Sequence, residues 1–82
     1  MEQILLIDWV DSYTINGWTM TSDCKAEILL CQSVGFKVDE TEDAICIALN
    51  KATKDGFRPY GELMSIPKVA IKGMKVIRVR GK

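Results

Sequence analysis

The 82-residue sequence contains no histidine, the side chain that most often serves as an acid, a base or a metal ligand near neutral pH. It also lacks a glycine-rich phosphate-binding loop and any cluster with metal-ligand spacing. Asp8 and Asp11 are the remaining acid pair, but on a strand residues three apart point to opposite faces. We therefore expect no enzymatic activity, no metal and no cofactor. Instead, Asp11 and Ser12 are expected to hydrogen-bond the nearby backbone where a strand becomes a loop.

Long apolar runs are also missing. No segment approaches the roughly 20 apolar residues that a membrane span requires, and the first residues lack the basic region of a signal peptide. These absences predict a cytoplasmic protein without a membrane partner.

Cysteine is scarce and odd in number. The three cysteines fit neither a disulfide framework nor the paired spacing of a zinc site, so we expect reduced thiols. Cys31 and Cys46 lie in apolar runs and are expected to fill the core, because a free thiol usually behaves as a small apolar side chain. Cys24 lies in a polar segment and is the thiol expected to be exposed.

The charges balance in number but not in position. Eleven acidic and five basic residues precede residue 63, whereas six basic and no acidic residues follow it. Such a chain can pair with itself or present its basic end to an anion. Alternatively, the C-terminal lysines and arginines are solvated positions on an edge strand, where charges prevent aggregation.

The segment 28–38 has the clearest periodicity. Apolar side chains alternate from Ile28 to Val38, interrupted only by Gln32, and a period of two predicts a long strand. We expect the alternating face, including Phe36, to be core. Gly35 falls on the opposite face, where the missing side chain allows a sharp bend or the close approach of another backbone.

The rest of the chain predicts one small β domain spanning residues 1–82. The charged turn 39–43 should join the long strand to 45–49 in a hairpin. We expect further strands at 4–10, 62–66 and 74–80, a loop at 50–61 and a 3₁₀ turn at 67–71. Five to six strands with one 3₁₀ turn before the last describe a mainly β, partly open SH3-like or Sm-like barrel, with an OB-like barrel as the alternative.

The N-terminal strand is apolar on both faces, so we expect it in the middle of a sheet or against a neighbouring subunit. Trp9 shares the apolar face of this strand and is expected to be core or a subunit contact. Since 82 residues make only a small core, we expect a homo-oligomer that hides further apolar surface.

Other aromatic residues lie in expected loops, where a ring either stacks on a base or covers an open end of the barrel. These are Tyr13, Trp18, Phe57 and Tyr60. The segment 51–60 mixes two of these rings with Lys51, Lys54 and Arg58, a combination that suits a phosphorylated base.

Several short elements resemble those of small proteins encoded by bacteriophages and prophages. They are Trp9 with Asp11, the pair Gly17 and Trp18, the stretch Val34 to Val38, and the stretch Ile66 to Ile71. The stretch 50–60 is an apparent insertion relative to that pattern. The resemblance implies an accessory protein in the cytoplasm of a bacterial host. One recurrent role of such proteins is to counter host immunity, and some phage proteins of this size do so as oligomers that sequester nucleotide-derived signals such as cyclic nucleotides.

On this interpretation, copies associate through the strand carrying Ile4 to Trp9 and hold the ligand between subunits. Aromatic rings would stack on the base while cations meet phosphate, giving the set Trp18, Lys54, Phe57, Arg58, Tyr60 and Lys68. One alternative is an acidic inhibitor that docks on a basic host defence enzyme through Asp8, Asp11 and the 39–43 turn. Another is an Sm-like binder of single-stranded nucleic acid that uses the basic C-terminal strand.

Overall fold

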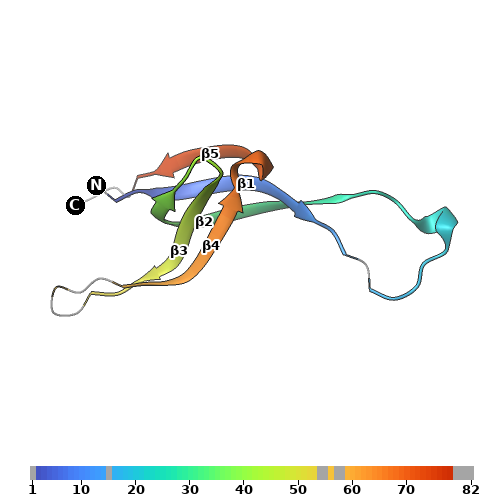
Figure 1. Ribbon diagram of the computed structural model, residues 1–82, viewed down its shortest axis with the longest axis horizontal. Helices are drawn as coiled ribbons and strands as arrows, with labels where there is room; N and C mark the ends of the chain where they lie inside the picture. Colours follow the sequence, from blue (N-terminus) through green and yellow to red (C-terminus); the bar gives the residue numbers. More distant parts are fainter. Residues whose placement is uncertain (1, 15, 54–55, 57–58, 79–82) are drawn as a thin grey trace.

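The protein is an open antiparallel sheet of five strands, as seen in a computed structural model that describes residues 2–14, 16–53, 56 and 59–78. Within those residues the only helices are two short 3₁₀ turns. The strand order is β4-β3-β2-β1-β5, and the molecule is elongated, with extents of 58 × 29 × 24 Å (Figure 1). The elements are β1 (Ile4–Ser12), η1 (Thr21–Asp23), β2 (Ile28–Glu40), β3 (Ala44–Lys51), β4 (Tyr60–Pro67), η2 (Lys68–Ala70) and β5 (Ile71–Ile77).

The predicted mainly β chain is confirmed, but β1 and β3 each end two residues later than expected. The 3₁₀ turn before the last strand lies within its expected range, whereas the charged hairpin turn is reduced to 41–43 because Asp39 and Glu40 belong to β2. β4 begins two residues earlier than expected, and β5 begins at Ile71 because η2 occupies only three residues. β5 is an edge strand on which Lys72 and Lys75 are exposed, as expected for solvated edge positions.

β1 lies inside the sheet, hydrogen-bonded to β2 on one side and to β5 on the other. This confirms the first of the two placements expected for the N-terminal strand. Leu5 and Ile7 are buried within the chain's own core, so their face of β1 is not free to contact another subunit. The expected association through 4–9 is therefore restricted to the opposite face of the strand.

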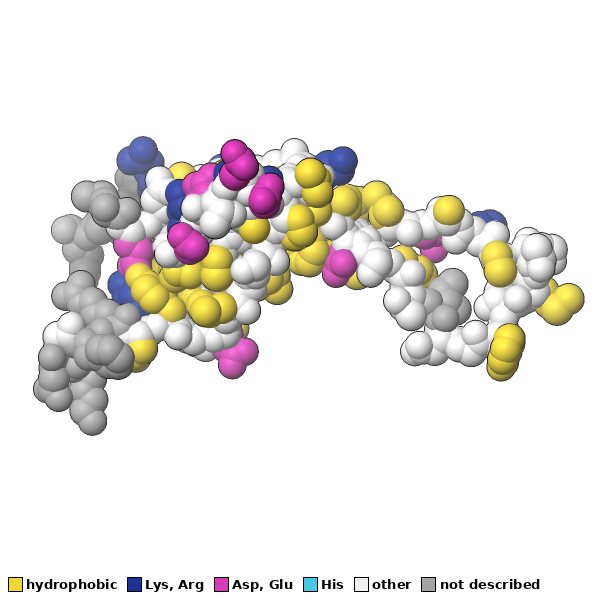
Figure 2. Space-filling view, viewed as in Figure 1, with side chains coloured by type: hydrophobic (Ala, Val, Ile, Leu, Met, Phe, Trp, Pro, Cys, Tyr) yellow, Lys and Arg dark blue, Asp and Glu magenta, His cyan; other side chains and the backbone are white. Residues whose placement is uncertain are grey.

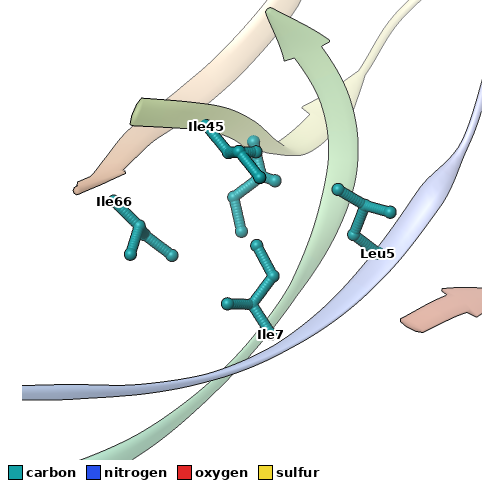
Figure 3. Packing of buried hydrophobic residues seen from close by; sticks show 5 residues of the cluster. Leu5, Ile7, Ile45 and Ile66 are labelled. Atoms are coloured by element: carbon teal, nitrogen blue, oxygen red, sulfur yellow. The ribbon is translucent and has the colours of Figure 1, made fainter. Parts of the chain in front are cut away.

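The core is a small aliphatic cluster shared by three strands (Figure 3). Its members come from the inward faces of β1, β3 and β4, and Trp9 and Ile71 pack against it. The Trp9 indole Nε1–H donates to Ser33 Oγ at 3.0 Å, which satisfies the polar end of a half-buried ring. Trp9 is thus part of the core, as expected. The cluster consists of Leu5, Ile7, Ile45, Ile47 and Ile66.

Gly35 allows β2 to bend between its two partners. β2 pairs with β1 up to Phe36 and with β3 from Phe36 onward. A Cβ atom at Gly35 would lie 2.8 Å from the Ala48 carbonyl oxygen and 3.1 Å from Ile47 Cβ. The close approach expected at this glycine is therefore present, and it brings β3 over the inner face of β2.

The expectation that the alternating apolar face of β2 is core is wrong. Ile28, Leu30 and Val34 are 61%, 76% and 48% exposed. The inward face of β2 carries Cys31, Ser33 and Gly35 instead, because these small residues leave room for bulky side chains from β1 and β3. Burial is decided here by side-chain size and not by hydrophobicity.

Three further core predictions are only partly met. Phe36 is half-buried and lies outside the aliphatic cluster. Cys31 and Cys46 are also half-buried, whereas Cys24 is exposed as predicted, and all three thiols are free. The core is smaller than the sequence suggests.

The described residues between Ser12 and Ile28, 13–14 and 16–27, form an arm that extends from the end of the β1–β2 ladder, where Ser12 pairs with Ile28 (Figure 1). Gly17 has a φ of +93°, a conformation that glycine adopts readily and other residues avoid. Hydrogen bonds found for the described part of the arm are internal, such as Asp23 N–H to the Met20 carbonyl at 2.8 Å. No helix in the described part of the chain is long and apolar enough to cross a membrane.

Candidate functional site

Of the six expected ligand-binding residues, the structure describes Trp18, Tyr60 and Lys68, and it does not bring these three together within one chain. Trp18 lies in the arm, and Tyr60 begins β4. The arm and the Lys51–Tyr60 end of the β3–β4 hairpin lie at opposite ends of the molecule (Figure 1). Lys68 lies in η2, away from both. The other three expected residues, Lys54, Phe57 and Arg58, lie outside the described residues.

Tyr60 belongs to an aromatic cluster that the sequence did not reveal. Its ring lies 6.3 Å from that of Phe36, centroid to centroid, with the planes inclined by 52°. Lys51 Nζ lies 5.3 Å from the Phe36 centroid, within the range of a cation–π contact. Lys51 also pairs with Glu2 at 2.6 Å, and the Tyr60 hydroxyl donates to the same carboxylate. Phe36 and Tyr60 therefore offer aromatic surface, but the charge of Lys51 beside them is already partly neutralised by Glu2.

Lys68 is likewise engaged in the fold. Its Nζ lies 2.7 Å from Glu40 at the end of β2, and Lys37 approaches the same carboxylate at 2.7 Å. The hydrogen bond from Lys37, followed by that from Lys68, lowers the pKa of Glu40 from 4.5 to about 2. The Lys68 backbone N–H also donates to the Asp43 carbonyl at 2.8 Å. These contacts fasten η2 to the β2–β3 hairpin.

The carboxylates of β1 have ordinary structural partners. Asp8 accepts a hydrogen bond from the Gln32 side-chain amide at 2.8 Å. Asp11 accepts from the Ser12 backbone N–H at 2.7 Å, as predicted for the end of the strand. In the ranges described, no group of histidine, cysteine, aspartate or glutamate side chains is arranged to hold a metal ion.

An apolar groove of about 320 Å³ lies where the β3–β4 hairpin diverges from β2. Phe36 and Ala48 are the last paired residues of β2 and β3 on this side, and beyond them the two strands separate. Glu62 in its wall has a φ of 58°, unusual for a residue other than glycine. The sequence signal for the groove is the run of two apolar residues, Leu63 and Met64, both of which line it. The groove is lined by Ser33, Val34, Ile47, Leu49, Glu62, Leu63 and Met64.

Exposed apolar surface is the dominant feature of the molecule. Fourteen large apolar side chains are exposed among the described residues, whereas the buried cluster has five members. Figure 2 shows such side chains gathered on the body of the sheet and again along the arm to its tip. Trp18 is fully exposed, as its expected place in a loop implies, and Leu30 and Met20 are each more than 70% exposed. Apolar side chains gathered on a surface, rather than scattered over it, mark a site of interaction with another molecule.

Comparisons with known proteins identify no relative: no family model matches the chain, and neither a curated protein nor a solved structure is significantly similar to it.

Proposed function

We propose that the protein acts by binding and not by catalysis, and that it works as a homo-oligomer. The exposed apolar surface carries this proposal, because a chain of 82 residues with a five-member core gains most of its remaining stabilisation by covering that surface. The carboxylates of β1 are engaged in structural hydrogen bonds, which supports a role other than acid–base chemistry.

The proposed ligand is a nucleotide-derived signal of the host that the protein sequesters without turnover. The support is the pair of rings, Phe36 and Tyr60, at the base of a segment whose sequence adds Phe57, Lys54 and Arg58. An aromatic ring can stack on a base, and a cation suits a phosphate. The phage origin of the protein is part of this proposal and rests on the resemblance of its short sequence elements.

The sheet is, in this proposal, an open variant of the SH3-like barrel. Two observations support that assignment: β1 lies between β2 and the last strand, and a 3₁₀ turn directly precedes that last strand.

Native mass spectrometry of the protein as isolated from cells tests both parts. We expect an oligomer with additional mass in the nucleotide range. Tyr60→Ala should lose that mass, whereas Tyr60→Phe, which keeps the ring and removes the hydroxyl, should retain it. A monomer contradicts the oligomer, and an oligomer that stays ligand-free when incubated with cell extract containing the signal contradicts the sequestering function.

A second candidate is an acidic inhibitor of a host protein. Asp39, Glu42 and Asp43 are exposed around the β2–β3 turn, and Glu40 is the member of this group that is paired with lysines. Reversing two of these charges, Glu42→Lys with Asp43→Lys, should abolish capture of the partner in a pull-down. Binding of single-stranded nucleic acid through the exposed Lys72, Lys75 and Arg78 would differ by weakening steeply with added salt.

A further inference from the structure

We propose that the arm of one copy packs into the groove of a second copy, with the Trp18 side chain as the part that enters. This inference rests on the proposed homo-oligomer and names the surfaces that form it. It needs no ligand.

The arm has the chemistry of an interface, and the hydrogen bonds found for its described residues stay within the arm itself. Its ring at Trp18 is fully exposed, and Tyr13 and Met20 are also exposed. At its base, Ile28 and Leu30 add exposed apolar side chains on one face of β2, and Leu29 adds one on the other face. A large aromatic ring held at the end of a projecting segment is the kind of anchor that dominates protein interfaces.

The groove fits such an anchor in size and polarity. Its volume of about 320 Å³ is at the lower end of the range for pockets that hold one small organic group. Leu49, Leu63 and Met64 provide apolar walls, and each of them is more than 40% exposed. Glu62 also lines the groove, and its side chain ends in a carboxylate, a group that can accept the hydrogen bond a buried indole N–H needs.

The geometry of the chain points to a second copy as the occupant. The arm leaves the sheet at the Ser12–Ile28 end of the β1–β2 ladder and extends away from it (Figure 1). The groove lies on the body, between β2 and the β3–β4 hairpin. An arm in this conformation does not reach the groove of its own chain, but a second copy presents the same groove to it.

The area available is sufficient for a stable contact. Without Leu29, which points to the other face of β2, the five exposed apolar side chains of the arm and its base offer about 500 Å², from ordinary values for aromatic and aliphatic side chains. A standard interface buries about 800 Å² on each partner, and about 60% of that area is apolar. The chain has no net charge, so two copies do not repel each other.

Mixing two variants tests the pairing. Trp18→Ala removes the anchor, and Leu63→Glu places a charge in the groove; both residues are exposed in the single chain, so each variant should fold. We expect each variant alone to associate at least about 30-fold more weakly than wild type, the effect typical of losing an interface anchor. A mixture should recover association, because one intact arm then meets one intact groove. Val69→Ala is the matched control, since Val69 is 93% exposed but lies in η2, outside both surfaces.

The outcomes separate this inference from the proposal on which it rests. A wild-type chain that is monomeric at all concentrations overturns both. An oligomer that neither variant weakens overturns the arm–groove contact but leaves the homo-oligomer standing. Variants that weaken association without recovery on mixing show that arm and groove do not pair with each other.

Discussion

Replacing Gly35 with alanine tests the account of why β2 bends. The new Cβ would lie 2.8 Å from the Ala48 carbonyl oxygen, and 3.1 and 3.2 Å from two atoms of Ile47. Since the nearest atom is backbone, β3 must shift to relieve the clash. Overpacking of this kind costs about 1–3 kcal/mol, and the lower entropy of the unfolded chain returns about 0.4–1 kcal/mol. We expect a net loss of about 1.5 kcal/mol, which lowers Tm by roughly 6–12 °C for a domain of this size.

Gly61→Ala is the control for this prediction. A Cβ there would meet its nearest neighbour, Asn50 Cβ, at 3.8 Å, an ordinary contact. Its Tm should therefore stay within a few degrees of wild type. Thermal unfolding of the three proteins should be followed by circular dichroism at one fixed protein concentration, because association makes Tm depend on concentration. Equal Tm values for the two variants would refute the reasoning.

Two further predictions concern the core and the ion pairs. Ile7→Ala should lower the free energy of unfolding by about 3 kcal/mol, because Ile7 is fully buried and its truncation leaves a cavity; a loss below 1 kcal/mol in urea titration would contradict its core position. Lys37 and Lys68 lower the pKa of Glu40 from its ordinary value of 4.5 to about 2. The ion pairs of Glu40 therefore stabilise the fold fully above pH 4.5, and this stabilisation is lost as the pH falls from 4.5 toward 2. Over this pH interval the Tm of wild type should thus fall by slightly more than that of Glu40→Gln, and added salt should reduce the difference. Parallel plots of Tm against pH for the two proteins would show that the ion pairs do not stabilise the fold.

The sequence predicts the elements of this protein well because its signals there are local. The alternation over 28–38, the charged hairpin turn and Pro67 before η2 each specify backbone conformation within a few residues. The close approach at Gly35 also follows from one residue, since only glycine leaves space on that face of the strand.

Sequence reasoning fails where burial depends on partners from elsewhere in the chain. The apolar face of β2 is predicted to be core, yet Leu30 on that face is 76% exposed. The small residues on the other face of β2 are the ones that point toward the core. An alternating pattern identifies two faces but does not decide which one the rest of the sheet covers. Small side chains gathered on one face, such as Ser33 and Gly35, are the signal that would have reversed the assignment.

The candidate site was predictable only in part for the same reason. The exposure of Trp18 follows from its polar neighbours, but its projection on an arm depends on where the β1–β2 ladder ends. The contacts of Tyr60 with Phe36 and Glu2 join residues far apart in sequence, which no local pattern indicates. The groove likewise exists because β3 and β2 separate beyond Phe36.

The molar mass of the purified protein in solution tests the central proposal most directly. Size-exclusion chromatography with light scattering, repeated over a hundredfold range of concentration, measures it without a label or a ligand. The account predicts a mass that is a multiple of the 9.2 kDa chain and that falls toward one chain on dilution or in Trp18→Ala. A constant mass of 9.2 kDa at every concentration would contradict it, because the exposed apolar surface would then be stable in water without a partner copy.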